Sequence, residues 1–303
     1  MKIAITGATG FLGRHVAVEM AGAGHQVRAW RNPAGPAPET LTAGIEPRSA
    51  AIDWVVGRLG DEDAAAALVQ GVDAVVHAAV YRGGPDFMTV EIDPVEYYRI
   101  NVLGSLRLLQ AAAAAGVRRF VFISSGAVHQ RVVSGRPIDE THPLWPGSLY
   151  GAGKAAVETL IHCYGAAGKI EACSLRPTSI YGLDDPPSRS RWHGLVRQIA
   201  SGSGPVDARG GAKSVHVEDL AAAARRLVET DADVAGETFL CVDRMISDFE
   251  VAEIARRLSG STTEIRGPAK ESRNEIDTAK LRSLGMTFGG REKLEATIRT
   301  MLR

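Results

Sequence analysis

Three glycines at a spacing of three follow the first apolar run of the chain and restrict what it can fold into. Residues 2–6 suit a short buried strand, Gly7, Gly10 and Gly13 come next, and apolar residues then recur at helical spacing as far as Met20. The glycines therefore occupy a turn from strand to helix, where a tight bend, a close ligand and close packing each exclude a Cβ. The start of the helix points unpaired N–H groups outwards, which favours an anion such as a pyrophosphate. Glycines that serve only the turn are the alternative interpretation.

Strand-like and helical patterns alternate along the first part of the chain. The strand-like runs after the glycine turn are His25–Arg31, Asp53–Val56, Asp73–His77, Arg119–Ser124 and Ile170–Leu175. This alternation predicts an α/β fold with a parallel sheet covered on both faces. The proline- and glycine-rich stretch Asn32–Pro47 is expected to be a loop. From Pro177 the pattern loosens, which indicates a smaller C-terminal lobe contributed by insertions.

Composition and charge argue against several classes of protein. The 35 basic and 35 acidic residues cancel, so the chain lacks the positive charge expected of a protein that binds nucleic acid. It has no run of about 20 apolar residues for a membrane span, and we expect no signal peptide before the first strand. Cys163, Cys173 and Cys241 lack metal-ligand spacing and indicate buried thiols in a reducing compartment. We therefore expect a cytoplasmic protein without a metal site, a nucleic-acid partner or a membrane contact.

Tyr150 and Lys154 lie four residues apart in a segment with helical character. Side chains at this spacing share one face of a helix, so the ammonium group can lie beside the phenol. An ordinary tyrosine has a pKa of about 10, and a neighbouring cation favours its phenolate. Such a pair can exchange a proton with a hydroxyl or carbonyl oxygen. A solvated helix face would show the same spacing.

The apolar run Phe120–Ile123 ends in two hydroxyl residues, Ser124 and Ser125. The end of this strand lies at the carboxyl edge, where open α/β sheets bind ligands. A serine there can bind the reacting oxygen and orient it toward the tyrosine. A serine that only serves the turn after the strand is the alternative.

Seven motifs in order give the chain a resemblance to a known family. They are Gly7–Gly13, Asp73–Ala79, Asn101–Gly104, Tyr150 with Lys154, Leu175–Gly182, Val215–Leu220, and Ile276–Leu281 continued to Leu284 and Gly285. Over nearly its whole length the chain resembles the extended short-chain dehydrogenase/reductases, also called NAD-dependent epimerase/dehydratases. The resemblance implies a Rossmann-type doubly wound parallel sheet with a small C-terminal substrate-binding lobe. It also implies a homodimer formed through the helices that contain Asn101 and Tyr150.

The chain is expected to divide into two parts on this basis. Residues 1–175, with 212–243 returning to them, would form the dinucleotide-binding domain. Residues 176–211 and 244–303 would form the substrate-binding lobe.

The resemblance also implies roles for individual residues. Tyr150 would be the acid/base, Lys154 would hold the nicotinamide ribose and lower the tyrosine pKa, and Ser125 would match the family's catalytic serine or threonine. The residues expected to bind the cofactor are Gly7, Thr9, Gly10, Phe11, Leu12, Gly13, Arg31, Leu59, Ala78, Ala79, Asn101, Tyr150, Lys154 and Pro177.

Two positions depart from the family's pattern. Gly57-Arg58-Leu59 stands where the family often has Gly-Asp-Leu, so the aspartate contact with adenine is in doubt, although Leu59 can still line that pocket through its backbone. His129 stands where a tyrosine commonly follows the catalytic serine. His129 either alters the substrate pocket or is a loop residue, and the sequence slightly favours the loop.

The end of the second strand-like run indicates the form of the cofactor. NAD recognition usually needs a carboxylate there for the ribose 2′-hydroxyl, whereas a 2′-phosphate calls for arginine. The sequence from Val27 to Asn32 has two arginines and no acid. We therefore expect Arg31 to bind the 2′-phosphate and NADP to be preferred over NAD. An exposed arginine at the end of a strand is the alternative.

The substrate is expected to contact three segments, which are Val80–Asp93, Gln130–Trp145 and Leu183–Arg197. Arg191 and His193 lie in an arginine-rich part of the last segment, and Arg82 stands beside two glycines in the first. These three residues are candidates to clamp a carboxylate or phosphate. A solvated basic face is the alternative.

The resemblance favours an NAD(P)-dependent dehydrogenase or ketoreductase, in which hydride passes between the nicotinamide and a carbonyl or hydroxyl carbon. The substrate is expected to be small and polar, with sugar-like molecules included. A NAD-dependent sugar-nucleotide epimerase is the alternative. Gly126 and Ala127 argue against a dehydratase, because dehydratases of the family tend to have acidic residues directly after the catalytic hydroxyl. A noncatalytic dinucleotide sensor is disfavoured because Ser125, Tyr150 and Lys154 are all present.

Overall fold

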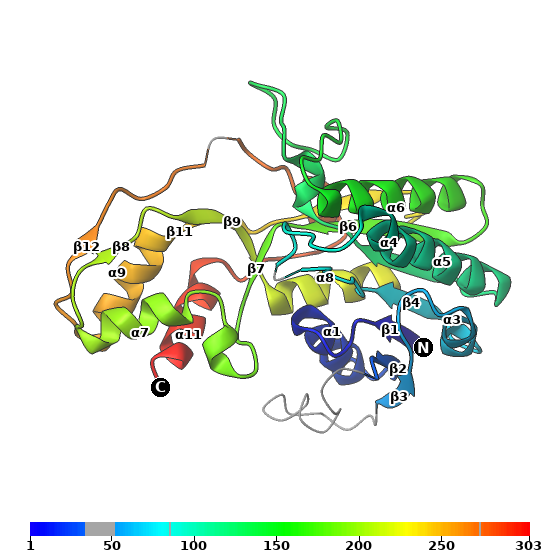
Figure 1. Ribbon diagram of the computed structural model, residues 1–303, viewed down its shortest axis with the longest axis horizontal. Helices are drawn as coiled ribbons and strands as arrows, with labels where there is room; N and C mark the ends of the chain where they lie inside the picture. The colour runs from blue at the N-terminus through cyan, green and yellow to red at the C-terminus, as the bar shows by residue number, and fades with distance from the viewer. Residues whose placement is uncertain (34–51, 85, 273) are drawn as a thin grey trace.

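A seven-stranded parallel sheet lies at the centre of the fold (Figure 1). The computed structural model describes residues 1–33, 52–84, 86–272 and 274–303. The strands are β1 Lys2–Thr6, β2 Gln26–Arg31, β3 Asp53–Val56, β4 Ala74–His77, β5 Arg119–Ile123, β6 Glu171–Pro177 and β10 Thr238–Cys241. Their order is β10-β6-β5-β4-β1-β2-β3, which reverses direction between β1 and β4. This is the order of a doubly wound Rossmann-type sheet, so the predicted fold class is confirmed.

The strand-like runs predicted from the sequence are strands of this sheet. Their ends differ from the predicted ends by at most two residues, and the largest difference is at β6, which continues to Pro177. Most of the predicted loop Asn32–Pro47 lies outside the described residues. Short apolar runs were sufficient to predict these strands, because a strand covered on both faces has apolar side chains on both sides.

Helices cover both faces of the sheet (Figure 1). On one face lie α1 (Phe11–Gly22) and α8 (Val217–Glu229), and on the other lie α3 (Glu62–Val69), α5 (Gly104–Ala114) and α6 (Leu149–Ala166). Consecutive strand residues point to opposite faces, so each strand contributes to both apolar layers.

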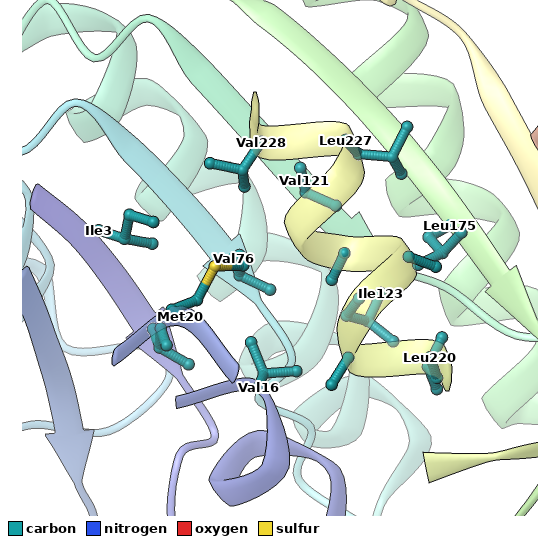
Figure 2. Close-up of a cluster of buried hydrophobic side chains, with 14 of the residues drawn as sticks. Ile3, Val16, Met20, Val76, Val121, Ile123, Leu175, Leu220, Leu227 and Val228 are labelled. Carbon is teal, nitrogen blue, oxygen red and sulfur yellow. The ribbon is translucent and has the colours of Figure 1, made fainter. Parts of the chain in front are cut away.

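The two faces hold two separate apolar cores. Figure 2 shows the first, in which Val16 and Met20 of α1 and Leu220 of α8 share one buried cluster with Ile3 of β1. The next residue, Ala4, belongs to the core on the opposite face. The two cores fix the sheet between its helices and therefore fix the edge at which the strands end.

A third core lies beyond the sheet, on the left in Figure 1. The further elements of the chain are α4 Pro94–Tyr98, η1 Arg99–Leu103, η2 Gly126–His129, β7 Ser179–Tyr181, η3 Pro187–Arg189, α7 His193–Ser201, β8 Val206–Asp207, β9 Gly211–His216, β11 Arg244–Ser247, α9 Asp248–Ser259, β12 Ile265–Arg266, α10 Ala279–Ser283 and α11 Gly290–Met301. Strands β11, β9 and β7 form a second sheet, and Val196, Ile254 and Ile298 from α7, α9 and α11 are buried in the third core. Leu281 and Met286 belong instead to the first core. The division into two domains stays a prediction.

The segment after β12 runs back from the third core toward the main sheet (Figure 1). There the Ile138 N–H donates to the Glu275 carbonyl at 2.9 Å, and the Asp277 N–H donates to the Ile138 carbonyl at 2.9 Å. These bonds tie the predicted substrate segment Gln130–Trp145 to the C-terminal part of the chain.

Candidate active site

The glycine turn after β1 is closed by packing at two positions and open at the third. Gly7 has a φ of +71°, and a Cβ on it would lie 2.7 Å from the Ala79 nitrogen. A Cβ on Gly13 would lie 2.0 Å from the Gly7 carbonyl oxygen. Gly10 caps α1 and is exposed, and a Cβ on it would meet only the Gly7 oxygen, at 3.3 Å. The first turn of α1, with its unpaired N–H groups, therefore stays open to an anion and fits a pyrophosphate.

The end of β2 lies beside the departure from the family's Gly-Asp-Leu pattern. A Cβ on Gly57 would lie 2.4 Å from the buried Trp30 ring nitrogen, so Trp30 requires the glycine. The Gly57 N–H donates to the Arg31 carbonyl at 3.1 Å, and Arg31 is half-buried. Arg58 is exposed, and Leu59 is half-buried. The position of the missing aspartate therefore holds a solvated cation.

A buried histidine connects the end of β1 with the residues after β4. His77 Nδ1 lies 2.7 Å from the Thr6 hydroxyl, and His77 Nε2 lies 2.8 Å from the Ser105 hydroxyl. The Thr6 hydroxyl also accepts from the Ala79 N–H at 3.1 Å. Burial, and then the charge of Lys154, lowers the pKa of His77 to about 3, so the ring is neutral. These bonds fix Ala79, which was predicted to line the cofactor.

The three predicted catalytic residues lie together at the carboxyl edge of the sheet. Lys154 Nζ donates to the Ile123 carbonyl oxygen at 2.7 Å and lies 5.9 Å from the centroid of the Tyr150 ring. The Ser125 hydroxyl lies close enough to the Tyr150 phenol to lower its pKa. Lys154 also lies 4.7 Å from the centroid of the Phe122 ring. The last residue of β5 therefore anchors the lysine, and the turn that follows supplies the serine.

Burial opposes charge on both members of the tyrosine–lysine pair. Burial raises the pKa of Tyr150, and the neighbouring Ser125 hydroxyl lowers it. The pKa of Lys154 is lowered to about 8, because burial lowers it more than the Glu158 carboxylate raises it. The sequence led us to expect that Lys154 lowers the tyrosine pKa. In the structure burial outweighs any such effect, because Tyr150 is half-buried and the ammonium group is directed to the Ile123 carbonyl.

Asn101 lies in the π-helical turn η1 and holds the segment after β4. Its side-chain oxygen accepts from the Tyr81 N–H at 2.8 Å, and its Nδ2 donates to the Tyr81 and Tyr97 carbonyls at 2.9 and 3.1 Å. A cavity of about 10 Å³ beside it is also lined by Tyr150 and Lys154, which is room for about one water molecule. Asn101 therefore positions the wall of the site through backbone contacts.

A buried ion pair lies behind the site. Arg176 of β6 donates to the Glu158 carboxylate at 2.6, 2.9 and 3.0 Å, and its Nη1 lies 3.1 Å from His129 Nε2. His129 Nδ1 lies 3.2 Å from the Pro143 carbonyl oxygen. Burial, and then Arg176, lowers the pKa of His129 to about 4. His129 is thus a buried, neutral residue that connects η2 with β6, which the sequence did not indicate.

The chain beyond Pro177, which ends β6, passes close to Ser125. A Cβ on Gly126 would lie 3.0 Å from the Thr178 methyl carbon. The next residue, Ser179, accepts a hydrogen bond from Arg191 Nη1. Arg191, predicted to contact the substrate, is thereby brought toward the residues that follow Pro177.

Arg191 is held in an unusual local structure. Its guanidinium carbon lies 4.8 Å from the centroid of the Trp192 ring, and its Nε is buried without a hydrogen-bond partner among the described residues. Trp192 has a φ of +68°, the one non-glycine residue in the described ranges with a positive φ, and its ring N–H donates to Asp248 at 2.8 Å. Backbone strain of this kind costs of order 1–3 kcal/mol and tends to occur at functional sites.

The other two predicted substrate residues are placed differently. The Arg82 guanidinium carbon lies 5.5 Å from the centroid of the Phe87 ring, and that ring lies 5.2 Å from the Tyr150 ring. His193 is the first residue of α7 and follows Trp192, which caps this helix. The sequence analysis did not identify Phe87, because it named the segment Val80–Asp93 but singled out no apolar residue in it.

Two features are absent from the described residues, a membrane-spanning helix and a metal-binding cluster. None of their helices has both the length and the apolar character needed to cross a membrane. No group of three or more His, Cys, Asp or Glu side chains in that part of the chain is arranged to hold a metal ion.

The strand order and the open glycine turn place the chain in the class of Rossmann-type dinucleotide-binding proteins. It belongs to the NAD dependent epimerase/dehydratase family, whose model matches residues 3–241. The resemblance found in the sequence is thereby confirmed.

Relatives with two kinds of activity are similar to the chain. The 3β-hydroxysteroid dehydrogenase/Δ5→4-isomerase of Mycobacterium tuberculosis is 31% identical over 192 residues, 61% of this chain and 48% of that protein. The UDP-glucose 4-epimerase of Azospirillum brasilense is 31% identical over 185 residues, 60% of this chain and 50% of that protein. The chain thus matches about half the length of these curated relatives.

A solved structure covers the whole chain. UDP-glucose-4-epimerase from Stenotrophomonas maltophila, with bound NAD and formylated UDP-arabinopyranose, has a TM-score of 0.81 and 22% identity, and covers 100% of this chain and 98% of its own. This likeness supports the fold.

Proposed function

We propose that the protein is an NAD(P)-dependent oxidoreductase of the dehydrogenase or ketoreductase type. Its substrate would be a small molecule, polar at the reacting carbon, with a carbonyl or hydroxyl group there. The observation that carries this proposal is the position of Lys154, which is buried against the Ile123 carbonyl beside the Tyr150 ring. Ser125 lies close enough to Tyr150 to lower the pKa of its phenol. Membership of the family supports the same conclusion.

Each of the three residues has a distinct task in this mechanism. Ser125 donates a hydrogen bond to the substrate oxygen, and Tyr150 gives a proton to that oxygen in reduction or takes it in oxidation. Lys154 supplies the positive charge that favours the phenolate and would hold the nicotinamide ribose. When bound, the nicotinamide gives or accepts the hydride at its C4. Gly10 and the start of α1 would hold the pyrophosphate, with Ala78, Ala79 and Pro177 lining the nicotinamide side.

The replacement of one phenol tests the mechanism. Tyr150→Phe should abolish turnover with every substrate and leave the Kd for the cofactor within about threefold of the wild type. Tyr164→Phe, a phenol removed from the far end of the same helix, is the matched control and should retain activity. Turnover by Tyr150→Phe at a rate near that of the wild type would refute the proposed acid/base role.

We further propose NADP as the preferred cofactor, with Arg31 at the end of β2 binding the 2′-phosphate. The absence of an acid between Val27 and Asn32 supports this choice. Arg31→Ala should weaken NADPH binding at least tenfold and change NADH binding little. Equal loss of both affinities would show that Arg31 does not read the 2′-phosphate.

A sugar-nucleotide epimerase is the second candidate, and the similarity to the Azospirillum brasilense enzyme favours it. In that reaction the hydride leaves and returns, so the cofactor is retained. Nucleotide released by denaturing the purified protein distinguishes the two. Stoichiometric, nonexchanging NAD supports the epimerase, whereas a site that exchanges freely and prefers NADPH supports the reductase.

We propose that Arg191 binds an anionic or oxygen-rich group of the substrate. Its Nε is buried and has no hydrogen-bond partner in the part of the chain that the structure describes, and Arg191 lies beside Ser179; both observations support this role. Residues 176–211 and 244–303 would form the substrate-binding lobe around it. Arg191→Lys keeps the charge but loses the planar fork, and should raise KM more than it lowers kcat.

We also propose a homodimer in the cytoplasm. An apolar groove of about 550 Å³ on η1 and α6 supports the dimer, and it is lined by Val95, Tyr98, Arg99, Val102, Leu103, Ala152 and Ala156. Val95 and Leu103 are 74% and 46% exposed, which is costly unless a partner covers them. Cys173 and Cys241 are buried as predicted, whereas the prediction was wrong for Cys163, which lies on an exposed face of α6. All three are free thiols, which supports a reducing compartment.

A further inference from the structure

The segment between β4 and α4 presents exposed apolar side chains next to Tyr150. Tyr81, Phe87 and Met88 are 43%, 43% and 49% exposed. The Phe87 ring lies against the Tyr150 ring, with their centroids 5.2 Å apart and their planes at 36°. Exposed apolar side chains beside a reactive group, as Phe87 and its neighbour Met88 are here, are typical of a surface that receives an apolar ligand.

Hydrogen bonds hold the tip of this segment in place. The Asp86 carboxylate accepts from the Met88 N–H at 2.7 Å and from the Thr89 N–H at 2.8 Å. The Glu91 N–H donates to the Gly83 carbonyl at 2.9 Å, and Gly83 has a φ of +71°. The apolar side chains at the tip therefore stand on a built turn with a defined position.

The charges of the segment favour a neutral ligand at this wall. Arg82 is the one cation between residues 80 and 93, and its guanidinium group lies over the Phe87 ring. Asp86, Glu91 and Asp93 are the carboxylates of the same stretch. With one cation and three carboxylates the segment has a net negative charge, which repels a diphosphate but has no such effect on an uncharged ring.

We propose that Phe87, with Met88 next to it, selects a substrate that carries an uncharged aromatic or alicyclic ring beside its reacting carbon. This inference rests on the proposed function, because it concerns the substrate of the same site. A ring packed on Phe87 lies next to the Tyr150 phenol, so one contact both binds the substrate and directs its oxygen to the proton donor. Phe87 is in this sense a specificity-determining residue, and Arg191 would hold a polar group farther from the reacting carbon.

Binding to an unreactive complex tests the proposal apart from catalysis. The full chain is saturated with NADP⁺, which cannot reduce a ketone, and the Kd of acetophenone is measured by calorimetry. Hydroxyacetone, a ketone without a ring, and UDP-galactose, a sugar nucleotide, are measured beside it. The variants are Phe87→Ala, which removes the ring, Phe87→Tyr, which keeps it, and Val95→Ala, which shortens an exposed apolar side chain on the groove of η1 and α6.

Acetophenone should bind the wild type, Phe87→Tyr and Val95→Ala with Kd values within about threefold of one another. Phe87→Ala should bind it at least about tenfold more weakly, since an aromatic contact and the buried area of the ring are lost together. Hydroxyacetone and UDP-galactose should show changes below about threefold in every variant. The melting temperature of Phe87→Ala should change little, because Phe87 lies at the surface and belongs to none of the three buried cores.

Three results would overturn the proposal: no binding of acetophenone to the wild type, an unchanged Kd in Phe87→Ala, or an equal loss of UDP-galactose binding in that variant. The last result would assign Phe87 to a sugar ring. Failure of the proposed function is recognised separately, by turnover in Tyr150→Phe, and leaves the binding comparison interpretable because the complex with NADP⁺ involves no proton transfer.

Discussion

The buried ion pair between Glu158 and Arg176 leads to a prediction about stability. Their side chains are 3% and 4% exposed, and three contacts of 2.6–3.0 Å join them. Glu158→Gln leaves the guanidinium charge buried without its counter-charge, a change that costs about 3–5 kcal/mol. Because the amide oxygen still accepts a hydrogen bond, we expect a loss of about 3 kcal/mol, or roughly a hundredfold in the unfolding equilibrium. Urea titration measures this loss directly.

The same substitution should alter protonation in the active site. Glu158 lies one helical turn after Lys154 and raises its pKa, which burial has lowered to about 8. Unit charges about 6 Å apart at an effective dielectric constant of about 20 interact by about 3 kcal/mol. Part of this interaction is offset by Arg176, so we expect Lys154 to lose its proton about tenfold more readily. Its pKa then falls below 8, and kcat/KM for carbonyl reduction begins to decrease at lower pH.

The double variant Glu158→Leu/Arg176→Met separates the two effects. An apolar pair of similar size removes both buried charges, so most of the lost stability should return. The pH profile should stay displaced, but less than in Glu158→Gln, because the carboxylate that acts on Lys154 is still absent and the opposing charge of Arg176 is removed with it. If the profile of Glu158→Gln coincided with that of the wild type, or if the double variant restored it, the electrostatic link between Glu158 and Lys154 would be refuted.

Two other predictions follow from close packing and from exposure. Gly13→Ala places a Cβ 2.0 Å from the Gly7 carbonyl oxygen and should lower both the melting temperature and the affinity for NADPH. Gly22→Ala in the same helix is the control and should lower neither, because a Cβ there has nothing within 4 Å. Equal effects of the two variants would contradict the packing argument. Leu103→Glu puts a charge on the groove of η1 and α6 and should convert the proposed dimer to a monomer in sedimentation velocity. An unchanged sedimentation coefficient would rule out this interface.

The fold and part of the site could be predicted because their signals are local. A strand covered on both faces needs only a short apolar run, and the glycine turn needs three positions whose spacing is visible in the sequence. Tyr150 and Lys154 share a helix face, so their proximity follows from four residues of sequence. Ser125 could be singled out because it follows the end of an apolar run, and such a run marks a strand.

The remainder of the site depends on contacts between distant positions. Arg176 meets Glu158 across 18 positions and His129 across 47, and His77 meets Thr6 across 71. Propensity and periodicity describe only neighbours along the chain, so they give no signal for such pairs. His129 illustrates the consequence, since a residue expected in a loop or a pocket is a buried link behind the catalytic helix.

Burial of both Tyr150 and Lys154 determines how the site should respond to pH in the two directions of reaction. Burial favours the neutral form of each, and the pKa of about 8 on Lys154 marks the loss of the first proton from the pair. Below that pH both groups are protonated, which is the form that reduces a carbonyl. Above it one proton is shared, and the tautomer with a phenolate and an ammonium group is the form that oxidises a carbinol. Reduction should therefore slow as pH rises through about 8, and oxidation should accelerate over the same interval and then level off. Initial rates in both directions test this sign, and profiles that rise or fall together would show that the two groups do not titrate as one pair.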